Sequence, residues 1–420
     1  MIRKFFILFF LGFFGFAEAQ QPSVGLTLKE AEQRFLKCNL SLLAERYNVD
    51  IAQARLLQAG LFDNPVISFE QNVYNRLNGK YFDFGKKGES VVEIEQVIRL
   101  AGQRNKQIRL EKINKEIAGY QFEEVMRTLR QELGEAFTEV FYLSKSLSVY
   151  DKEINSLEHL LTGIKEQHAK GNISLMEMAR LESMLLSLKK DKNECESNYL
   201  SRRGELNLLL NLPADFRTEP VIDEGDLRQL NMDRLSYADL QERVHGRPDQ
   251  KLARSCVTAS QADLKLQKAL AFPEFAVKGS YDRQGNFINN YFAIGFSMSV
   301  PIFNRNQGNI KMARFNLLKA DREQEYSRKK AEAELYAAYT ALEKACQLYQ
   351  STDMGLEQNF EKLIAGANEN FIKRNISLLE FIDFYDSYKE TCIRLYEIKK
   401  NVLLGIENLN AVAGQPIFNY

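Results

Sequence analysis

An internal duplication constrains this sequence more than any other feature. Residues 172–177 (NISLME) return as residues 375–380 (NISLLE), and Pro65 returns as Pro273, in each case about 200 residues later. So long a period excludes a solenoid, because solenoid repeats are only about 20–50 residues long. We therefore expect two copies of one structural unit, each with the same order of elements.

The N-terminus has the pattern of an export signal. Arg3 and Lys4 precede an apolar run at 5–16, and Ala17-Glu18-Ala19 is a small-x-small cleavage site. The apolar run is shorter than the roughly 18–20 residues that a membrane-spanning helix needs. The expected organisation is a signal peptide at 1–19, a first repeat at 20–212, a linker at 213–233 and a second repeat at 234–420.

Each repeat is expected to contain a long helical hairpin, at 103–211 and 306–411. No proline lies between Pro65 and Pro213 or between Pro301 and Pro416, and proline inside a helix costs about 3 kcal/mol. Apolar residues in these stretches recur at the alternating three- and four-residue spacing of coiled coils. The three seams are Phe122, Met126, Leu129, Leu133, Phe137 and Val140; Ala331, Leu335, Ala338, Leu342, Ala345 and Tyr349; and Leu378, Phe381, Tyr385, Tyr388, Cys392 and Leu395. Charged residues between them, such as Arg127 and Glu334, are expected on solvated faces.

The repeated hexapeptide is expected to turn each helical hairpin. Gly171 directly precedes the first copy and is suited to end a helix, because glycine adopts the left-handed conformation without strain. Ser174 and Ser377 can cap the N-terminus of the returning helices.

Each repeat also contains a pair of predicted strands, at 65–99 and 273–301. Apolar and polar residues alternate there, as in 291–300, with the period of two that is typical of strands. Each of the four segments has about the ten residues that a tilted strand needs to cross a bilayer. The predicted lipid-facing residues are Phe275, Phe292, Ile294 and Phe296.

Four strands cannot close a barrel, and open sheet edges cannot face lipid. The strands are therefore expected to be completed by other copies of the chain. The alternative is a soluble sheet that packs on helices.

Composition argues against several classes of function. The chain has 56 basic and 56 acidic residues, whereas a general nucleic-acid-binding protein has a basic excess. Its five cysteines lack paired spacing, and its three histidines form no ligand cluster. A phosphate-binding glycine loop and a nucleophile motif are both absent, so no catalytic residue, cofactor or metal site is expected.

The order of strand hairpin, long helical hairpin and the same again resembles the TolC family of outer-membrane efflux proteins. The motifs that carry the resemblance are LTLKEA at 26–31, DNP at 63–65, RPD at 247–249 and SVPIFNR at 299–305. The resemblance covers essentially the whole mature chain and is strongest to the CzcC-like branch that works with resistance-nodulation-division pumps.

The resemblance implies a mainly α fold with β structure. Long coiled-coil hairpins would form a periplasmic α-barrel, and four strands per chain would complete a trimeric transmembrane β-barrel. It places the protein in the outer membrane, extending into the periplasm, without enzymatic activity or a cofactor. The implied partners are two further copies of the chain, a periplasmic adaptor, an inner-membrane pump and outer-membrane lipid.

The leading functional hypothesis is a passive exit duct for metal ions or small toxic compounds. Two alternatives remain open at this stage. Within the same fold, the chain could be the outer component of a type I protein secretion system. In another class, it could be a periplasm-spanning coiled-coil scaffold that conducts nothing.

The resemblance also implies where the functional residues lie. The hairpin tips, at Gly171, Asn172, Arg374 and Asn375, would face the adaptor. Inward-facing carboxylates just past the second tip would form a periplasmic gate, and the matching positions are Glu380 and Asp383. The first repeat has Glu177 and Arg180 at these positions, so the hypothesis is that Arg180 pairs with an acid of a neighbouring hairpin and holds the gate shut.

Overall fold

The computed structural model describes residues 23–418 except 226–231, 233–234, 286–287, 354, 356–363 and 365. The predicted signal peptide and parts of the linker, of the second strand hairpin and of the second helical hairpin lie outside the described residues. The chain forms two compact units, which are Met1–Phe35 with Ala136–Ile222, and Leu36–Glu135 with Asp223–Tyr420. The bounds of these units differ from those of the two predicted repeats, so the repeat boundaries stay a prediction.

The first unit is a helical hairpin with a small parallel strand pair. Helix α3 (Gln103–Ala169) enters this unit at Ala136, and α4 (Leu175–Leu209) returns along it. With 67 residues, α3 is about 100 Å long. Strands β1 (Ser23–Thr27) and β6 (Arg217–Val221) pair in parallel, and α1 (Leu28–Cys38) follows β1. The apolar seam is buried here as predicted, with Phe137 and Val140 fully buried.

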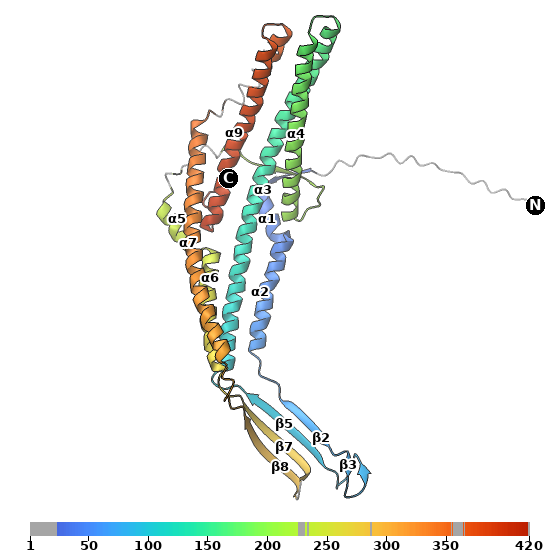
Figure 1. Cartoon of the computed structure of the whole chain (residues 1–420), viewed down its shortest axis with the longest axis vertical. Coiled ribbons are helices and arrows are strands. Elements are labelled where there is room, and N and C mark those ends of the chain that lie inside the picture. The colour runs from blue at the N-terminus through green and yellow to red at the C-terminus, as the bar shows by residue number, and fades with distance from the viewer. Residues whose placement is uncertain are drawn as a thin grey trace, which may run out of the picture. The chain divides into compact units, whose positions relative to one another are not determined.

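The second unit contains the remaining helices. These are α2 (Leu40–Ala59), the first part of α3, α5 (Tyr237–His245), α6 (Pro248–Ala269), α7 (Gln307–Ser351) and α9 (Leu378–Ala413). Helix α7 contacts both α6 and α9 (Figure 1). All six predicted seam residues of α9 are buried, from Leu378 to Leu395.

One α7 seam prediction is wrong, three residues of the first predicted seam (Phe122, Met126 and Leu129) are only half-buried, and two charged residues expected on solvated faces bind other elements. On α7, Cys346 is buried, whereas Ala345 is half-exposed. Arg127 does not lie on a solvated face, because its guanidinium donates to the backbone oxygen of Ala411 at 2.9 Å. Glu334 also has a structural role, since it binds a buried arginine.

That buried arginine is Arg247 of the RPD motif, only 3% of which is exposed. It pairs with Asp249 at 2.6 Å and Glu334 at 3.0 Å, and donates to the backbone oxygen of Val412. Burial alone would lower the pKa of Arg247, but the hydrogen bonds and charges of the two carboxylates outweigh it and raise that pKa. The motif therefore ties the start of α6 to α7 and to the end of α9.

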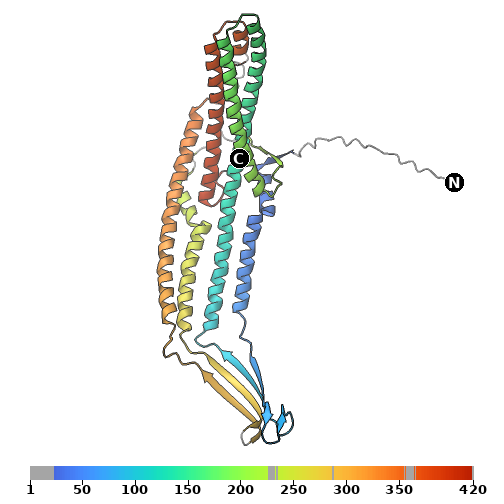
Figure 2. The same cartoon turned by 45° about the vertical axis from the view of Figure 1, so that its right-hand side comes forward.

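A four-stranded antiparallel sheet completes the second unit. Its strands are β2 (Val66–Gln71), β5 (Ser90–Ile98), β7 (Phe275–Gly285) and β8 (Ile288–Met298), in the order β2-β5-β7-β8. Both predicted strand hairpins thus form, and β5 joins β7 to make one sheet from the two halves of the sequence. The sheet lies beyond one end of α2, α6 and α7 (Figures 1 and 2).

Within the predicted strand pair at 65–99, the first strand ends at Gln71, because the chain turns into a short ribbon. This ribbon consists of β3 (Tyr74–Asn75) and β4 (Lys80–Tyr81). Among the helices of the described residues, none is long and apolar enough to cross a membrane.

Candidate functional site

The sheet has one apolar and one polar face. Its register places Ile94 beside Gly279 and Ile294 in one row across three strands. The residues that share this apolar face are Ile67, Phe69, Val92, Ile94, Ile98, Phe275, Val277, Tyr281, Phe292, Ile294, Phe296 and Met298. Gln96 and Gly279 also lie on this face. Because side chains alternate along a strand, the residues of the other parity point to the opposite face, which is mainly polar.

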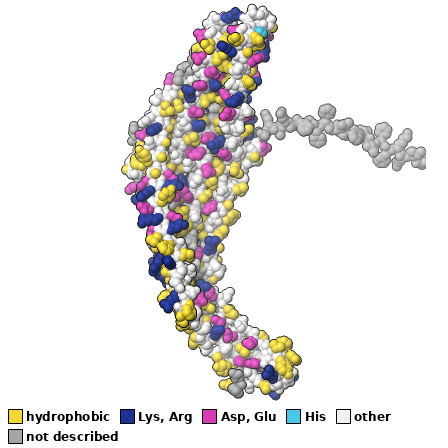
Figure 3. Space-filling view, viewed as in Figure 1, with side chains coloured by type: hydrophobic (Ala, Val, Ile, Leu, Met, Phe, Trp, Pro, Cys, Tyr) yellow, Lys and Arg dark blue, Asp and Glu magenta, His cyan; other side chains and the backbone are white. Residues whose placement is uncertain are grey.

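The four predicted lipid-facing residues all lie on this apolar face, and their contact with lipid stays a prediction. Phe292, Ile294 and Phe296 are 75%, 78% and 69% exposed. Phe275 is half-buried, because its ring stacks on that of Phe296 with centroids 5.6 Å apart. Figure 3 shows hydrophobic side chains reaching the surface at the sheet end of the second unit.

The polar face carries an ion triad that the sequence analysis missed. Lys278 of β7 lies between Glu93 and Glu95 of β5, with its Nζ atom 3.1 Å and 2.7 Å from their carboxylates. Only the β5–β7 register shows that these three residues touch. A sheet with paired charges on one face and mainly apolar side chains on the other suits a barrel with an aqueous lumen.

The two predicted hairpin turns are stereochemical copies of each other. The amide of Gly171 donates to the backbone oxygen of His168, and that of Asn172 to Gln167. Arg374 and Asn375 repeat both bonds, to Phe371 and Asn370. Each turn is thus a Schellman motif. The first turning residue is left-handed in both, with φ of 78° at Gly171 and 59° at Arg374.

Both returning helices begin with the same capping box. The hydroxyl and backbone amide of Ser174 donate to Glu177, and those of Ser377 donate to Glu380. These bonds confirm the two serine caps, and those to Glu380 lower its pKa. Two of the four proposed gate residues, Glu177 and Glu380, therefore have a structural role in starting a helix.

The other two gate candidates, Arg180 and Asp383, are exposed one helical turn further along α4 and α9. Within the described residues, neither side chain forms an ion pair in the single chain. The two pairs of gate candidates belong to different compact units. The pairing of Arg180 with an acid of a neighbouring hairpin therefore stays a hypothesis.

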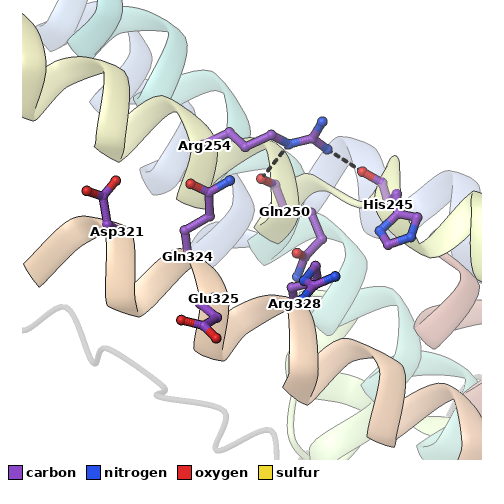
Figure 4. Close-up of a pocket in the computed structure, with 7 residues that line it drawn as sticks. All are labelled: His245, Gln250, Arg254, Asp321, Gln324, Glu325 and Arg328. Atoms are coloured by element: carbon purple, nitrogen blue, oxygen red, sulfur yellow. Dashed lines mark hydrogen bonds between the residues drawn. The ribbon is translucent and has the colours of Figure 1, made fainter. Parts of the chain in front are cut away.

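A pocket of about 400 Å³ lies where α5 and α6 meet α7 (Figure 4). Arg254 crosses it and donates to the backbone oxygens of Gln250 and His245, so this guanidinium joins the end of α5 to α6. On the α7 side, Glu325 pairs with Arg322 and Lys329. Gln250 of α6 in addition donates to Ser327 of α7. Arg254 and Gln250 therefore hold the three helices together, whereas the ion pairs of Glu325 lie within α7.

In the described part of the chain, no group of three His, Cys, Asp or Glu residues could hold a metal ion. The five cysteines are free thiols, and burial raises the pKa of Cys195 to about 11. Such a thiol is protonated near neutral pH and is a poor nucleophile.

Curated relatives match this chain at low identity. The pyoverdine export outer membrane protein OpmQ of Pseudomonas aeruginosa is 23% identical over 214 residues, which are 50% of this chain and 42% of OpmQ. The cobalt-zinc-cadmium resistance protein CzcC of Cupriavidus metallidurans is 23% identical over 293 residues, or 69% of this chain and 66% of CzcC. The matched segments thus span less than two thirds of either relative.

Solved structures share the fold over nearly the whole chain. A CusC structure superposes with a TM-score of 0.73 at 15% identity and covers 93% of each chain. The CmeC outer membrane channel of Campylobacter jejuni gives 0.73 at 16% identity and covers 92% of this chain and 85% of CmeC. The family model for outer membrane efflux proteins matches residues 240–365. In agreement with the resemblance seen in the sequence, this part of the chain is similar to the outer membrane efflux protein family, and nearly the whole chain shares the fold of solved outer-membrane channels.

Proposed function

We propose that this protein is the outer-membrane channel of a tripartite efflux system. Three copies would close a twelve-stranded barrel, through which metal ions or small toxic compounds leave the cell passively. The observation that carries the proposal is the two-faced sheet, apolar on one side and polar with the Glu93–Lys278–Glu95 triad on the other. That distribution is the one required of a barrel with lipid outside and water inside.

The free edges of the sheet support the trimer. Strands β2 and β8 are the outer strands, and within the described residues each has one edge without a strand partner. The sheet is antiparallel throughout, so β8 of one copy is oriented correctly to pair antiparallel with β2 of the next. Edges that lie in lipid must be paired, because nothing there satisfies their backbone groups.

The helices next to these edges support the same closure. Helix α2 leads into β2, and α7 follows β8, so they would meet across each contact between copies. Both helices expose apolar side chains in the single chain. These are Leu40, Tyr47, Ile51 and Leu57 on α2, and Met312, Phe315, Leu318, Tyr326 and Tyr336 on α7. A second copy would remove both stripes from water.

Cysteine crosslinking between edge strands tests the proposed barrel. Ser68 of β2 and residues Ala293, Gly295 and Ser297 of β8 lie on the polar face. Ser68→Cys combined with Cys at one of these three positions is expected to yield disulfide-linked trimers. The matched control, Phe69→Cys with the same partner, places its thiol on the opposite face and should not crosslink. Crosslinking by neither combination would contradict the closure.

The hairpin tips are proposed to bind a periplasmic adaptor that joins the channel to an inner-membrane pump. Asn172 and Asn375 are exposed in turns of the same geometry, so an adaptor could use one binding mode on both. A photocrosslinker at either position is expected to capture the adaptor in cells. Capture only from residues 72–89, at the other end of the strands, would reverse the orientation.

Arg180 and Asp383 remain the gate candidates, with Glu177 and Glu380 now placed at the helix starts. Asp383→Ala and Arg180→Ala are each expected to raise the resting conductance. Glu380→Ala combined with Asp383→Ala is expected to lower cation selectivity. Wild-type conductance and selectivity in all these variants would show that these charges do not form the gate.

Two relatives support small solutes over polypeptides as the cargo. Their names concern pyoverdine export and resistance to cobalt, zinc and cadmium. A strain that lacks the gene is expected to become sensitive to divalent metals or small toxic compounds, and the intact gene should restore resistance. Unchanged resistance together with loss of a secreted polypeptide would instead support a type I secretion role.

A further inference from the structure

The loop between β2 and β5, residues 72–89, is built more rigidly than an ordinary strand connection. The Asn75 side chain is only 5% exposed and donates to the backbone oxygen of Lys87 at 2.6 Å and to Asp83 at 3.2 Å. Asp83 also accepts from the Gly85 amide and from Asn78. A Cβ atom at Gly88 would lie 1.5 Å from the Asp83 backbone oxygen, so only glycine permits this path.

The fixed path turns apolar side chains outward. Leu77, Tyr81 and Phe84 are 77%, 72% and 63% exposed, and the Tyr81 ring packs against that of Tyr74. Arg283 of β7 donates to the backbone oxygen of Phe84, so this surface lies at the loop end of β7, two residues beyond Tyr281 of the apolar sheet face. The apolar surface of the sheet therefore has an apolar border in the loop.

The same loop carries an excess of positive charge. Its four basic residues are all exposed, and within the described residues their side chains form no ion pair. They are Arg76, Lys80, Lys86 and Lys87. The only acids of the loop are Asp83 and Glu89, and the carboxylate of Asp83 is occupied by the hydrogen bonds that hold the loop. Lys80 also interacts electrostatically with Asp83. Basic side chains are thus presented beside exposed aromatic rings, and they outnumber the acids of the loop by four to two.

We propose that residues 72–89 bind phosphorylated lipid headgroups of the outer leaflet that surrounds the barrel. The inference rests on the proposed function, which places the helices in the periplasm and this loop at the outer surface. Lys and Arg bind phosphate oxygens through charge-assisted hydrogen bonds. Aromatic side chains gather at membrane interfaces, because one end of each ring system is apolar and the other tolerates water. The loop supplies both, next to the face proposed to contact acyl chains.

Native mass spectrometry of the purified full-length protein tests this proposal. The probes are bisphosphorylated lipid A and a dephosphorylated lipid A with the same acyl chains. The wild type is expected to bind the phosphorylated form about tenfold or more tightly, because clustered basic residues are attracted to an anionic lipid surface. Equal binding of the two forms would overturn the proposal. Complete competition by inorganic phosphate at equal phosphate concentration would assign the loop to free phosphate instead.

Two sets of variants locate the effect. Changing Arg76, Lys80, Lys86 and Lys87 to Gln should abolish the preference for phosphate. The matched control changes four exposed basic residues of the helices to Gln and should keep it; these are Lys190, Lys319, Lys344 and Arg394. A preference that survives in the loop variant, or is lost equally in the control, would contradict the assignment.

Two further measurements separate this proposal from its premises. Gly88→Ala keeps all four basic side chains but blocks the loop path, and is expected to weaken the preference about threefold or more. An unchanged preference would show that the built loop does not matter. Conductance is measured on the same samples, and the loop variant is expected to conduct like the wild type. A wild type that binds lipid but does not conduct would refute the channel and not the lipid site.

Discussion

The cost of a charge on each face of the sheet can be worked out from the β8 register. Ile294 lies midway along this strand, opposite Gly279, on the apolar face. An arginine at the midplane of a lipid-facing strand costs about 2–4 kcal/mol. Phe292 and Phe296 lie two residues away, which is about 7 Å along the strand and about 5 Å in depth at a tilt near 45°. Because the cost falls toward the interfaces, we expect about 1–3 kcal/mol for arginine at these two positions.

Ala293 supplies the matched control, because it neighbours Ile294 in sequence but points to the polar face. Its cross-strand partner is Ser280, which in turn pairs with Glu93. An arginine there would face water and a carboxylate, so Ala293→Arg should cost less than about 1 kcal/mol. The assay is the fraction of folded trimer in lipid vesicles over a urea series. Equal losses for Ile294→Arg and Ala293→Arg would refute the assignment of the two faces.

Three other predictions concern the helices. Arg374→Gly should stabilise the protein by about 0.5 kcal/mol, because it removes left-handed strain, whereas Gly171→Ala should cost about 1 kcal/mol; thermal melting measures both. Arg247→Met should cost about 2–4 kcal/mol by leaving Asp249 without its buried partner, and adding Asp249→Asn should recover part of this loss in the same melts. Folding lowers the pKa of Glu380. The ionised Glu380 therefore stabilises the fold fully above its unfolded pKa of about 4.3, and this stabilisation is lost as the pH falls through its folded pKa. Glu380→Gln should therefore weaken the dependence of melting temperature on pH below 5, and an unchanged dependence would contradict the capping role.

The features that could be predicted from the sequence are those encoded by neighbouring residues. The faces of β8 follow from its alternation, because side-chain direction in a strand depends only on parity. The helix starts at Ser174 and Ser377 follow from capping boxes that span four residues. Because the sequence is duplicated, the same local pattern predicts the same feature in both copies, as at 172–177 and 375–380.

The features that were missed depend on partners distant in the sequence. Arg247 meets Glu334, and Lys278 meets Glu93, only because α6 packs on α7 and β5 pairs with β7. The burial of Cys346 in place of the predicted Ala345 has a different cause. A straight helix has 3.6 residues per turn, so a seam with a strict 3.5-residue period drifts out of register unless a four-residue step is repeated.

Single-channel recording in planar lipid bilayers tests the central claim most directly. Purified wild-type protein is expected to insert as trimers and to give stepwise conductance. The sign of its ion selectivity should shift when the Glu93–Lys278–Glu95 triad is altered by Lys278→Gln, since this change leaves two carboxylates per chain facing the lumen without their cation. Protein that inserts but carries no current would contradict the channel and favour a scaffold. Current that is insensitive to Lys278→Gln would show that the polar face of the sheet does not line the pore.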